Sequence, residues 1–356
     1  MDASVKKNMM HVIVFLAIIF ISLMSGCISQ SYANSWATEM MQINKLHDLG
    51  LYGSGITLGI IDTGVETDHG DFDVSTFLSW HDYVSNLSSP YDDKGHGTHI
   101  AGILFARGSW LGSLSGYNLQ GVCPDARGIV VKVTSKTGEC RDEDVARAIN
   151  FCADNGADII LLSLGESPET LDIGKQSFDA CVNAINQGII IVVPAGDDGL
   201  HDDGDVNIFS NVSEVISVGS IRRDRYISAF SSRGNQAWVP GKHGERVDPD
   251  KKPELVAPGE NIISTYLDGG YIGLSGTSQA AAYVAGTIAL LLEAYPELNK
   301  SKEKICLIKE VLAKTAKKVG GNELYNGEPL SHNDRYGYGL IQAYNAYVEL
   351  SRYVEG

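Results

Sequence analysis

Three short segments of the sequence carry side chains that could take part in covalent chemistry. Asp62 follows an apolar run and precedes a Thr-Gly pair, and His96 lies between two glycines. Ser278 follows a Gly-Thr pair and opens another apolar run. Nucleophilic catalysis by serine needs a hydroxyl, an imidazole that takes its proton, and a carboxylate that orients the imidazole. The sequence supplies all three groups, and the glycines beside them leave room for close approach of the backbone.

Each segment also has a simpler interpretation. Asp62 could be a turn residue that bonds its own backbone. An Asp-Thr-Gly sequence also occurs in aspartic proteases, but these need two such carboxylates, and no second copy is present. His96 and His99 have a spacing that could hold a metal, but no third ligand follows, and we expect His99 to be a packed, hydrogen-bonded helix residue. Ser278 could simply cap a helix, although a helix N-terminus also stabilises developing negative charge.

The surrounding pattern alternates apolar runs with amphipathic stretches. Near-continuous apolar runs predict buried strands at residues 56–61, 128–134, 158–164 and 189–193, with two further candidates at 215–218 and 261–265. Helical periodicity lies between them and after them, around residues 145–152, 178–185, 277–295 and 302–316. This order predicts an α/β fold with a doubly wound, mainly parallel sheet and helices on both faces. In such sheets, sites form where strands end and helices begin, which is where the three segments lie.

The N-terminus differs from the rest of the sequence. Lys6 and Lys7 precede an apolar run over residues 9–24, and Ser25-Gly26-Cys27 follows it. A positive start, an apolar run and small residues before a cysteine are typical of an export signal with a lipidation site at Cys27; the alternative is an uncleaved anchor helix. We therefore expect residues 1–27 to be a signal sequence or membrane anchor, 28–35 a short linker, and 36–356 a catalytic domain that faces outward from the cell membrane.

Charge and cysteine content limit the partners and the covalent cross-links. The 28 basic residues against 44 acidic residues give a net charge of −16, which argues against a nucleic-acid partner. Without Cys27, five cysteines remain, so at least one thiol should stay unpaired. Cys152 and Cys181 fall on the apolar faces of the expected helices and should be buried.

The order of the reactive segments resembles that of the subtilisin-type serine proteases (subtilases). The resemblance rests on Ile-Ile-Asp-Thr-Gly at 60–64, Gly-His-Gly-Thr-His-Ile-Ala-Gly at 95–102 and Gly-Thr-Ser-Gln-Ala at 276–280. Further segments that resemble the family follow in order at residues 158–165, 193–199, 228–234, 255–259 and 338–341. The likeness spans about residues 36 to 350.

The resemblance implies a serine endopeptidase that acts on protein or peptide substrates and needs no cofactor for its chemistry. Ser278 would be the nucleophile, His96 the general base and Asp62 the carboxylate that orients it. The family's substrate-binding strand would be formed by Ser163, Leu164 and Gly165, unless these residues are ordinary sheet interior. A degenerate domain that binds peptides or acts as a scaffold is the alternative function.

Asp71 matches a position that ligates a structural calcium in some subtilases, although the partner loop at residues 108–120 is altered and longer. The other candidate for a calcium site is an acidic run, which could equally be a solvated loop: Asp197, Asp198, Asp202, Asp203 and Asp205.

The sequence departs from the family pattern at the oxyanion hole. Asp197 stands where the family has an asparagine that donates an N–H to the oxyanion. An ionised aspartate donates nothing, so only the protonated acid could help. Some relatives, including one branch of the proprotein convertases, work with aspartate here. The residues that follow Ser278, Gln-Ala-Ala-Ala-Tyr, also differ from the usual Met-Ala-Ser-Pro-His.

Overall fold

The computed structural model describes residues 32–109, 112–113, 116–164, 175–200, 206–234, 236–239, 242–245, 251–298, 301–321 and 331–354. The chain divides into two units, Met1–Tyr32 and Ala33–Gly356, and every element named below belongs to the second. The predicted export signal and Cys27 lie outside the described residues. Asn34 is hydrogen-bonded through both side-chain atoms to the backbone of Ile263, so the second unit includes the end of the expected linker.

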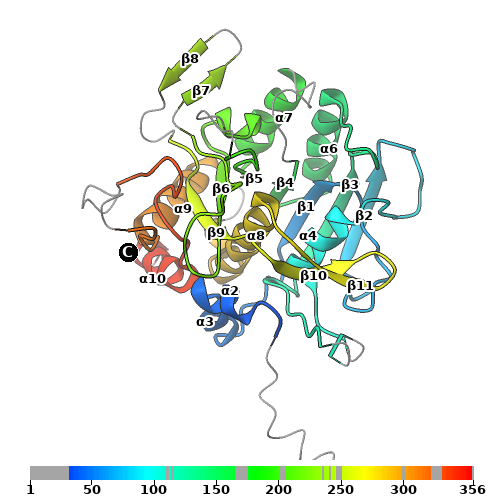
Figure 1. The fold of residues 1–356 in the computed structure, drawn as a ribbon. Helices are drawn as coiled ribbons and strands as arrows, with labels where there is room; N and C mark the ends of the chain where they lie inside the picture. Colours follow the sequence, from blue (N-terminus) through cyan, green and yellow to red (C-terminus); the bar gives the residue numbers. More distant parts are fainter. Residues whose placement is uncertain are drawn as a thin grey trace, which may run out of the picture. The chain divides into compact units, whose positions relative to one another are not determined.

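A parallel sheet of seven strands forms the centre of this unit (Figure 1). Its strands in spatial order are β2 (Phe77–Asp82), β3 (Arg127–Lys132), β1 (Thr57–Asp62), β4 (Ile159–Leu162), β5 (Ile190–Pro194), β6 (Ile216–Ile221) and β9 (Leu255–Pro258). All neighbouring pairs run parallel, and the sheet confirms the predicted fold class. Because Asp62 pairs with Lys132 and Ile61 with Leu162, the carboxyl ends of β3, β1 and β4 meet at one edge.

Helices cover the sheet. On one side, α4 (His96–Phe105) and α8 (Thr277–Ala294) contact each other and the strands, and on the other side α6 (Asp142–Asp154) packs with α7 (Lys175–Asn186) (Figure 1). Within the described residues, four further α-helices lie outside this central arrangement: α2 (Ser35–Met40), α3 (Ile43–His47), α9 (Lys302–Thr315) and α10 (Ala343–Val354). Nearly all of α8 is buried, which explains its continuous apolar sequence.

Three features of the sheet differ from the sequence expectation. One is β9, which forms an edge of the sheet although no strand was predicted there. The strand expected at 261–265 is β10 (Ile262–Tyr266), but it pairs antiparallel with β11 (Gly270–Leu274) and lies outside the main sheet. Strand β2 was not predicted, because an edge strand with one neighbour is only partly buried and its sequence, Phe-Leu-Ser-Trp-His-Asp, mixes apolar and polar residues. A second hairpin joins β7 (Gln236–Val239) and β8 (Lys242–Glu245).

The cysteines of the described residues are all unpaired. Cys152 and Cys181 are completely buried, as predicted, and Cys123 and Cys140 are also buried, whereas Cys306 is exposed. No helix among the described residues combines the length and the apolar composition that a membrane span requires.

Candidate active site

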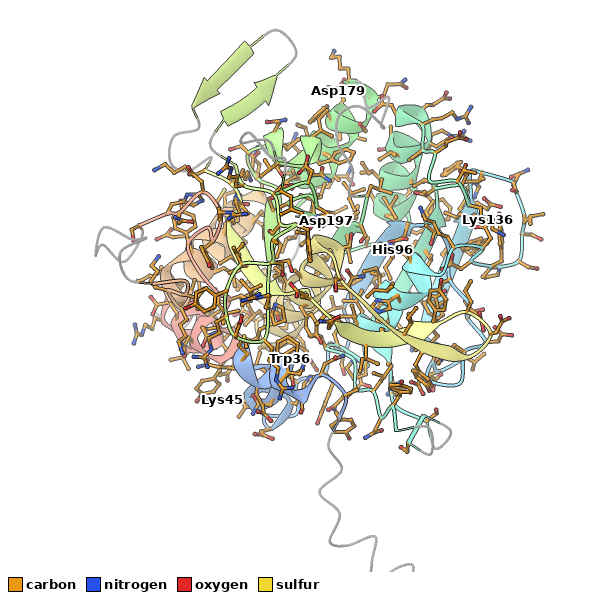
Figure 2. The ribbon with its side chains drawn as sticks, in the orientation of Figure 1. Trp36, Lys45, His96, Lys136, Asp179 and Asp197 are labelled. Atoms are coloured by element: carbon orange, nitrogen blue, oxygen red, sulfur yellow. The ribbon has the colours of Figure 1, made fainter. Side chains whose placement is uncertain are left out.

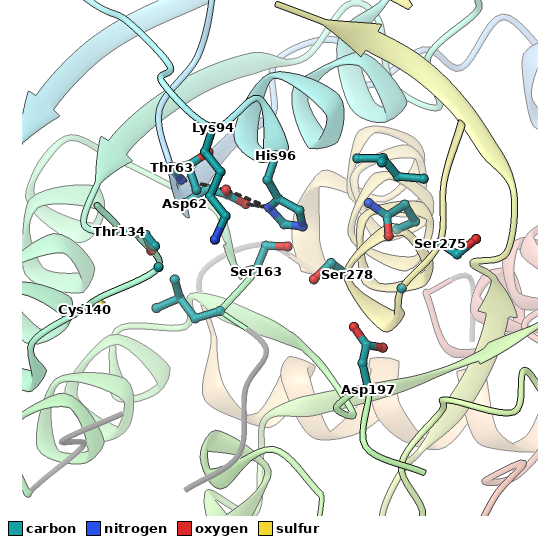
Figure 3. A pocket seen from close by; sticks show the side chains of 15 residues that line it. Asp62, Thr63, Lys94, His96, Thr134, Cys140, Ser163, Asp197, Ser275 and Ser278 are labelled. Carbon is teal, nitrogen blue, oxygen red and sulfur yellow. Dashed lines mark hydrogen bonds and ion pairs between the residues drawn. The ribbon is translucent and has the colours of Figure 1, made fainter. Parts of the chain in front are cut away.

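Asp62 and His96 meet where β1 ends and α4 begins (Figure 3). Nδ1 of His96 lies 2.8 Å and 2.9 Å from the two carboxylate oxygens of Asp62. A carboxylate can only accept, so Nδ1–H donates and Nε2 is left as the basic nitrogen. The side chain of Asp62 is 1% exposed and that of His96 is 26% exposed, so the imidazole can be reached from solvent while its partner cannot.

The end of β1 is fixed to the start of α4 by Asp92 and Thr63. Oδ1 of Asp92 accepts from the Thr63 hydroxyl at 2.9 Å and from the Gly95 N–H at 2.8 Å, and Oδ2 accepts from the N–H and hydroxyl of Thr98. The Thr63 hydroxyl in turn accepts from the Gly97 N–H, and the Thr63 N–H donates to Asp62 at 2.6 Å. Asp92 and Thr63 therefore satisfy N–H groups at the start of α4, and Thr63 also holds Asp62.

Close packing at this junction requires glycine at position 97. A Cβ on Gly97 would lie 2.1 Å from the carbonyl oxygen of Gly64. The glycines beside His96 thus serve close approach, as the sequence suggested.

The ammonium of Lys132, at the end of β3, is buried beside the same junction. It donates to the carbonyls of Thr63 at 2.6 Å and Thr134 at 2.9 Å, with Asp93 as its ion-pair partner.

The pKa of His96 results from opposing effects. Burial disfavours the charged imidazolium and lowers the pKa, but the negative charge of Asp62, its hydrogen bond and the charge of Asp92 outweigh burial. The pKa of His96 is therefore raised. The ring is a good proton acceptor, and it becomes free to accept a proton as the pH rises through this pKa.

Ser278 is the second residue of α8 and is 5% exposed. It lines a cavity of about 320 Å³ together with Asp62 and His96 (Figure 3). No hydrogen bond joins Ser278 to His96 here, and such bonds often form only when substrate is bound. The N–H of Ser278 belongs to the first turn of α8, where N–H groups have no partner within the helix and can stabilise an anion.

His99 has no place in the cavity. Its Nε2 lies 3.0 Å and 3.2 Å from the carbonyls of Ile262 and Ile272, and burial lowers the pKa of His99 to about 3. His99 is therefore a neutral packing residue, as predicted. Gln279, which replaces the usual methionine, lies with its amide 3.4 Å from Nδ1 of His99.

Asp197 lines the same cavity, and Figure 3 shows its carboxylate on the side of Ser278. Oδ1 of Asp197 accepts the N–H of Thr277 at 2.7 Å, and the Thr277 hydroxyl accepts from the Gly196 N–H. Surrounding protein atoms raise the pKa of Asp197 above the usual range, and the bond from Thr277 opposes that rise. Because the side chain is exposed to the water of the cavity, the rise is smaller than complete burial would cause.

The segment after β4 forms the floor of the cavity. Ser163 and Leu164 are buried and line it, whereas Gly165 lies outside the described residues. The Ser163 hydroxyl is buried without a hydrogen-bond partner. The carbonyl of Leu164 accepts from the Asn207 side chain at 2.6 Å, and the N–H of Asn207 donates to Ala195. Asn207 therefore connects the floor to the strand end that carries Asp197.

Asp71 lies away from these residues. It is 1% exposed; Oδ1 accepts from the Tyr271 hydroxyl at 3.0 Å, whereas Oδ2 is buried without a partner. An unpartnered buried carboxylate oxygen is a feature that a cation would satisfy. Within the described part of the chain, however, no three His, Cys, Asp or Glu side chains gather around a possible metal. Asp202, Asp203 and Asp205 of the acidic run fall in the undescribed segment 201–205.

The supporting residues Asp92, Lys132 and Asn207 were not found from the sequence. Asp92 lies four residues before His96 in Asp92-Asp93-Lys94-Gly95, which reads as an ordinary polar turn. Lys132 was assigned to the apolar strand 128–134 and Asn207 to no motif. One signal for Lys132 was present in the sequence: it is a charged residue within a strand that the pattern predicts to be buried, and a buried charge needs a partner.

Comparisons with known proteins agree with this geometry. The profile of the Subtilase family matches residues 53–339. The chain is 31% identical over 291 residues to subtilisin DY of Bacillus licheniformis, covering 82% of this chain and 94% of that protein. It is 31% identical over 301 residues to a thermostable alkaline protease of Halalkalibacterium halodurans, covering 84% and 72% respectively.

A third relative is the minor extracellular protease Epr of Bacillus subtilis, which is 30% identical over 318 residues. The match covers 89% of this chain but only 42% of Epr. The matched residues include the whole cavity described above and the strands and helices that form it. The chain belongs to the subtilase family of serine-type endopeptidases.

Proposed function

We propose that this protein hydrolyses peptide bonds of protein or peptide substrates through an acyl-enzyme on Ser278. The observation that carries the proposal is the hydrogen bond from His96 to the buried Asp62 within the cavity that also contains Ser278. A scaffold that only binds peptides would have no need of a buried carboxylate that raises the pKa of an accessible imidazole. The alternative of a degenerate subtilase domain is therefore not favoured.

The arrangement supports the following steps. Nε2 of His96 takes the proton of the Ser278 hydroxyl as Oγ attacks the carbonyl carbon of the scissile bond. The negative charge moves to the carbonyl oxygen, near the N-terminus of α8. The C–N bond then breaks, and His96 returns the proton to the leaving amine. Water attacks the acyl-enzyme by the same route and restores the Ser278 hydroxyl. Asp62 stays ionised and stabilises the imidazolium throughout.

Ser278→Ala should abolish hydrolysis of denatured casein, and His96→Ala should be about as damaging, because the three side chains act as a unit. Both losses should be roughly 10⁶-fold in kcat. Ser351→Ala, in α10, is the matched control and should keep wild-type turnover with the same circular dichroism spectrum. Wild-type turnover in Ser278→Ala would refute the proposed function.

We further propose that the protein is exported and held at the outer side of the cell membrane by a lipid on Cys27. The charged start, the apolar run over 9–24 and the small residues before Cys27 support this. The name of Epr describes that relative as extracellular. Mass spectrometry of the membrane fraction should find a lipidated N-terminal Cys27. An intact Met1 terminus on the mature protein would contradict lipidation and indicate a helical anchor instead.

For Asp197, we propose that the protonated carboxyl donates to the oxyanion through Oδ2. The bond that Oδ1 accepts from the Thr277 N–H supports this, because it leaves the second oxygen for the cavity. The raised pKa favours the neutral acid, whereas His96 must be unprotonated to act as the base. Activity should therefore require a pH that is low enough for Asp197 and high enough for His96. A narrow, bell-shaped pH profile follows.

Asp197→Asn should raise kcat at neutral pH about 10- to 100-fold, because the amide oxygen can still accept from Thr277 while the amide nitrogen donates at any pH. The loss of one such donor costs about 3–4 kcal/mol in a subtilisin. Steady-state kinetics from pH 5 to 9 measure the effect. Asp154→Asn is the control, since Asp154 is exposed at the end of α6, does not line the cavity and is not among the charges that shift the pKa of Asp197. A kcat that is unchanged or lower across the range contradicts the protonated-donor role.

A structural calcium at Asp71 is a further proposal, supported by the unpartnered buried Oδ2. Carbonyl oxygens would have to supply most of the other ligands. EGTA should lower the Tm of the wild type by a few degrees, because a ligand that binds only the native state stabilises it. Asp71→Asn, which keeps an oxygen for Tyr271, should remove that dependence. An EGTA-insensitive Tm in the wild type would contradict the proposal.

A further inference from the structure

We propose that Lys94 makes this enzyme select substrates with an acidic side chain within the three residues that precede the scissile bond. The inference deepens the proposed function and rests on it. It concerns a side chain of the cavity that the catalytic steps do not use. Of the residues that line the cavity in the described part of the chain, Lys94 is the only lysine or arginine.

The backbone of Lys94 is held on both sides. Its N–H donates to Oδ1 of Asp92 at 3.1 Å, and its carbonyl accepts from the Tyr266 hydroxyl at 3.2 Å. Only the side chain is free to move, and it is exposed. Figure 3 shows the side chain of Lys94 extending into the open space of the cavity, with the ammonium toward Ser163.

The ammonium reaches across to the loop that follows β3. A Cβ built on Gly138 would lie 3.3 Å from Nζ of Lys94, and Gly138, Thr134 and Cys140 form the wall on that side. In Figure 3 this wall lies on the side of His96 away from Asp197. Ser278 lies between the two ends, so the cavity has a cation at one end and a carboxyl at the other.

No carboxylate of the described residues neutralises this cation. Among the described residues Lys94 has no ion pair and no hydrogen bond from its ammonium, and the carboxylates of its nearest chain neighbours, Asp92 and Asp93, are already engaged, as is that of Asp62 in the cavity. Asp62 accepts from His96 and Thr63, and Asp92 accepts from the start of α4. Asp93 pairs with the buried Lys132 at 2.7 Å. The ammonium of Lys94 is therefore available to pair with a carboxylate of the substrate, and no ion pair among the described residues has to break first.

The position of the cation defines which part of the substrate it meets. Under the proposed function, the segment before the scissile bond lies along the floor formed by Ser163 and Leu164. Lys94 and the wall at Thr134 and Cys140 border that same part of the cavity. The segment after the scissile bond leaves past Ser278. An acidic side chain that Lys94 can pair with therefore belongs to the preceding segment.

The size of the preference follows from the exposure of Lys94. An ion pair that remains in contact with water contributes little and is screened by salt. A bound peptide excludes some of that water, which strengthens the pair. We expect a glutamate in the favoured position to raise kcat/KM roughly 2- to 5-fold over glutamine. The preference should decrease in 1 M NaCl.

The test uses internally quenched peptides that are identical except for Glu, Gln or Lys at one of the three positions before the scissile bond. Wild type, Lys94→Gln and Lys94→Glu are compared, with cleavage sites verified by mass spectrometry. Lys136→Gln is the matched control, because it removes the same charge from an exposed residue of the facing loop that does not line the cavity (Figure 2). Binding of fluorescent Glu and Gln peptides to Ser278→Ala is measured in parallel by polarisation.

The wild type and Lys136→Gln should prefer Glu at one position, Lys94→Gln should lose the preference, and Lys94→Glu should prefer Lys. Equal kcat/KM for Glu and Gln at all three positions, or a preference that survives in Lys94→Gln, would overturn the role of Lys94. If the wild type cleaves neither these peptides nor casein, the proposed function fails. The polarisation arm then decides the role of Lys94 alone, since equal binding of Glu and Gln peptides overturns it.

Discussion

The carboxylate of Asp92 is the group on which the geometry of the active site most depends. It accepts hydrogen bonds from Thr63 at the end of β1, from the loop that carries Lys94, and from Thr98 in the first turn of α4. Burial raises its pKa, but the bonds from these N–H and O–H donors outweigh burial and lower it. Asp92 therefore stays ionised over the pH range in which His96 titrates, and the junction persists while the base changes its charge.

This junction explains why several unrelated residue types occur together. Thr63 must be a hydroxyl residue because its hydroxyl donates to Asp92 and accepts from the Gly97 N–H, while its backbone N–H holds Asp62. Residue 97 must be glycine because of the carbonyl of Gly64. A second junction of the same kind joins the end of β5 to α8, through the paired bonds between the Gly196–Asp197 segment and Thr277. Both reactive helices thus begin on residues contributed by strand ends.

Much of this arrangement follows from the sequence. Apolar runs predicted β1, β3, β4, β5 and β6 to within about two residues at most ends, because buried parallel strands require continuous apolar sequence. Asp62, His96 and Ser278 were predicted to lie where strands end and helices begin, and therefore at one edge of the sheet. In the structure all three line one cavity. The partner of Asp197 could not be predicted, since Thr277 is 80 residues away in the chain.

Other features also depended on long-range packing. The edge strand β2 has mixed polarity, and the strand at Ile262–Tyr266 pairs with β11 instead of joining the sheet. The ammonium of Lys132 is buried because three oxygens surround it, which no local pattern reveals. The sequence analysis assigned no role to Lys94, and only its direction in the folded protein places its charge in the cavity.

The central claim is that the Asp62–His96 pair activates Ser278. The rate at which a fluorophosphonate labels Ser278, measured from pH 5 to 9, tests it most directly, because labelling requires attack by the serine but no particular peptide. The account predicts that the rate rises on the acid side of its pH profile as His96 loses its proton, with the midpoint of that rise above the usual pKa of histidine. Asp62→Asn should lower both the rate and this midpoint. Labelling that is independent of pH, or equally fast in Asp62→Asn, would contradict it.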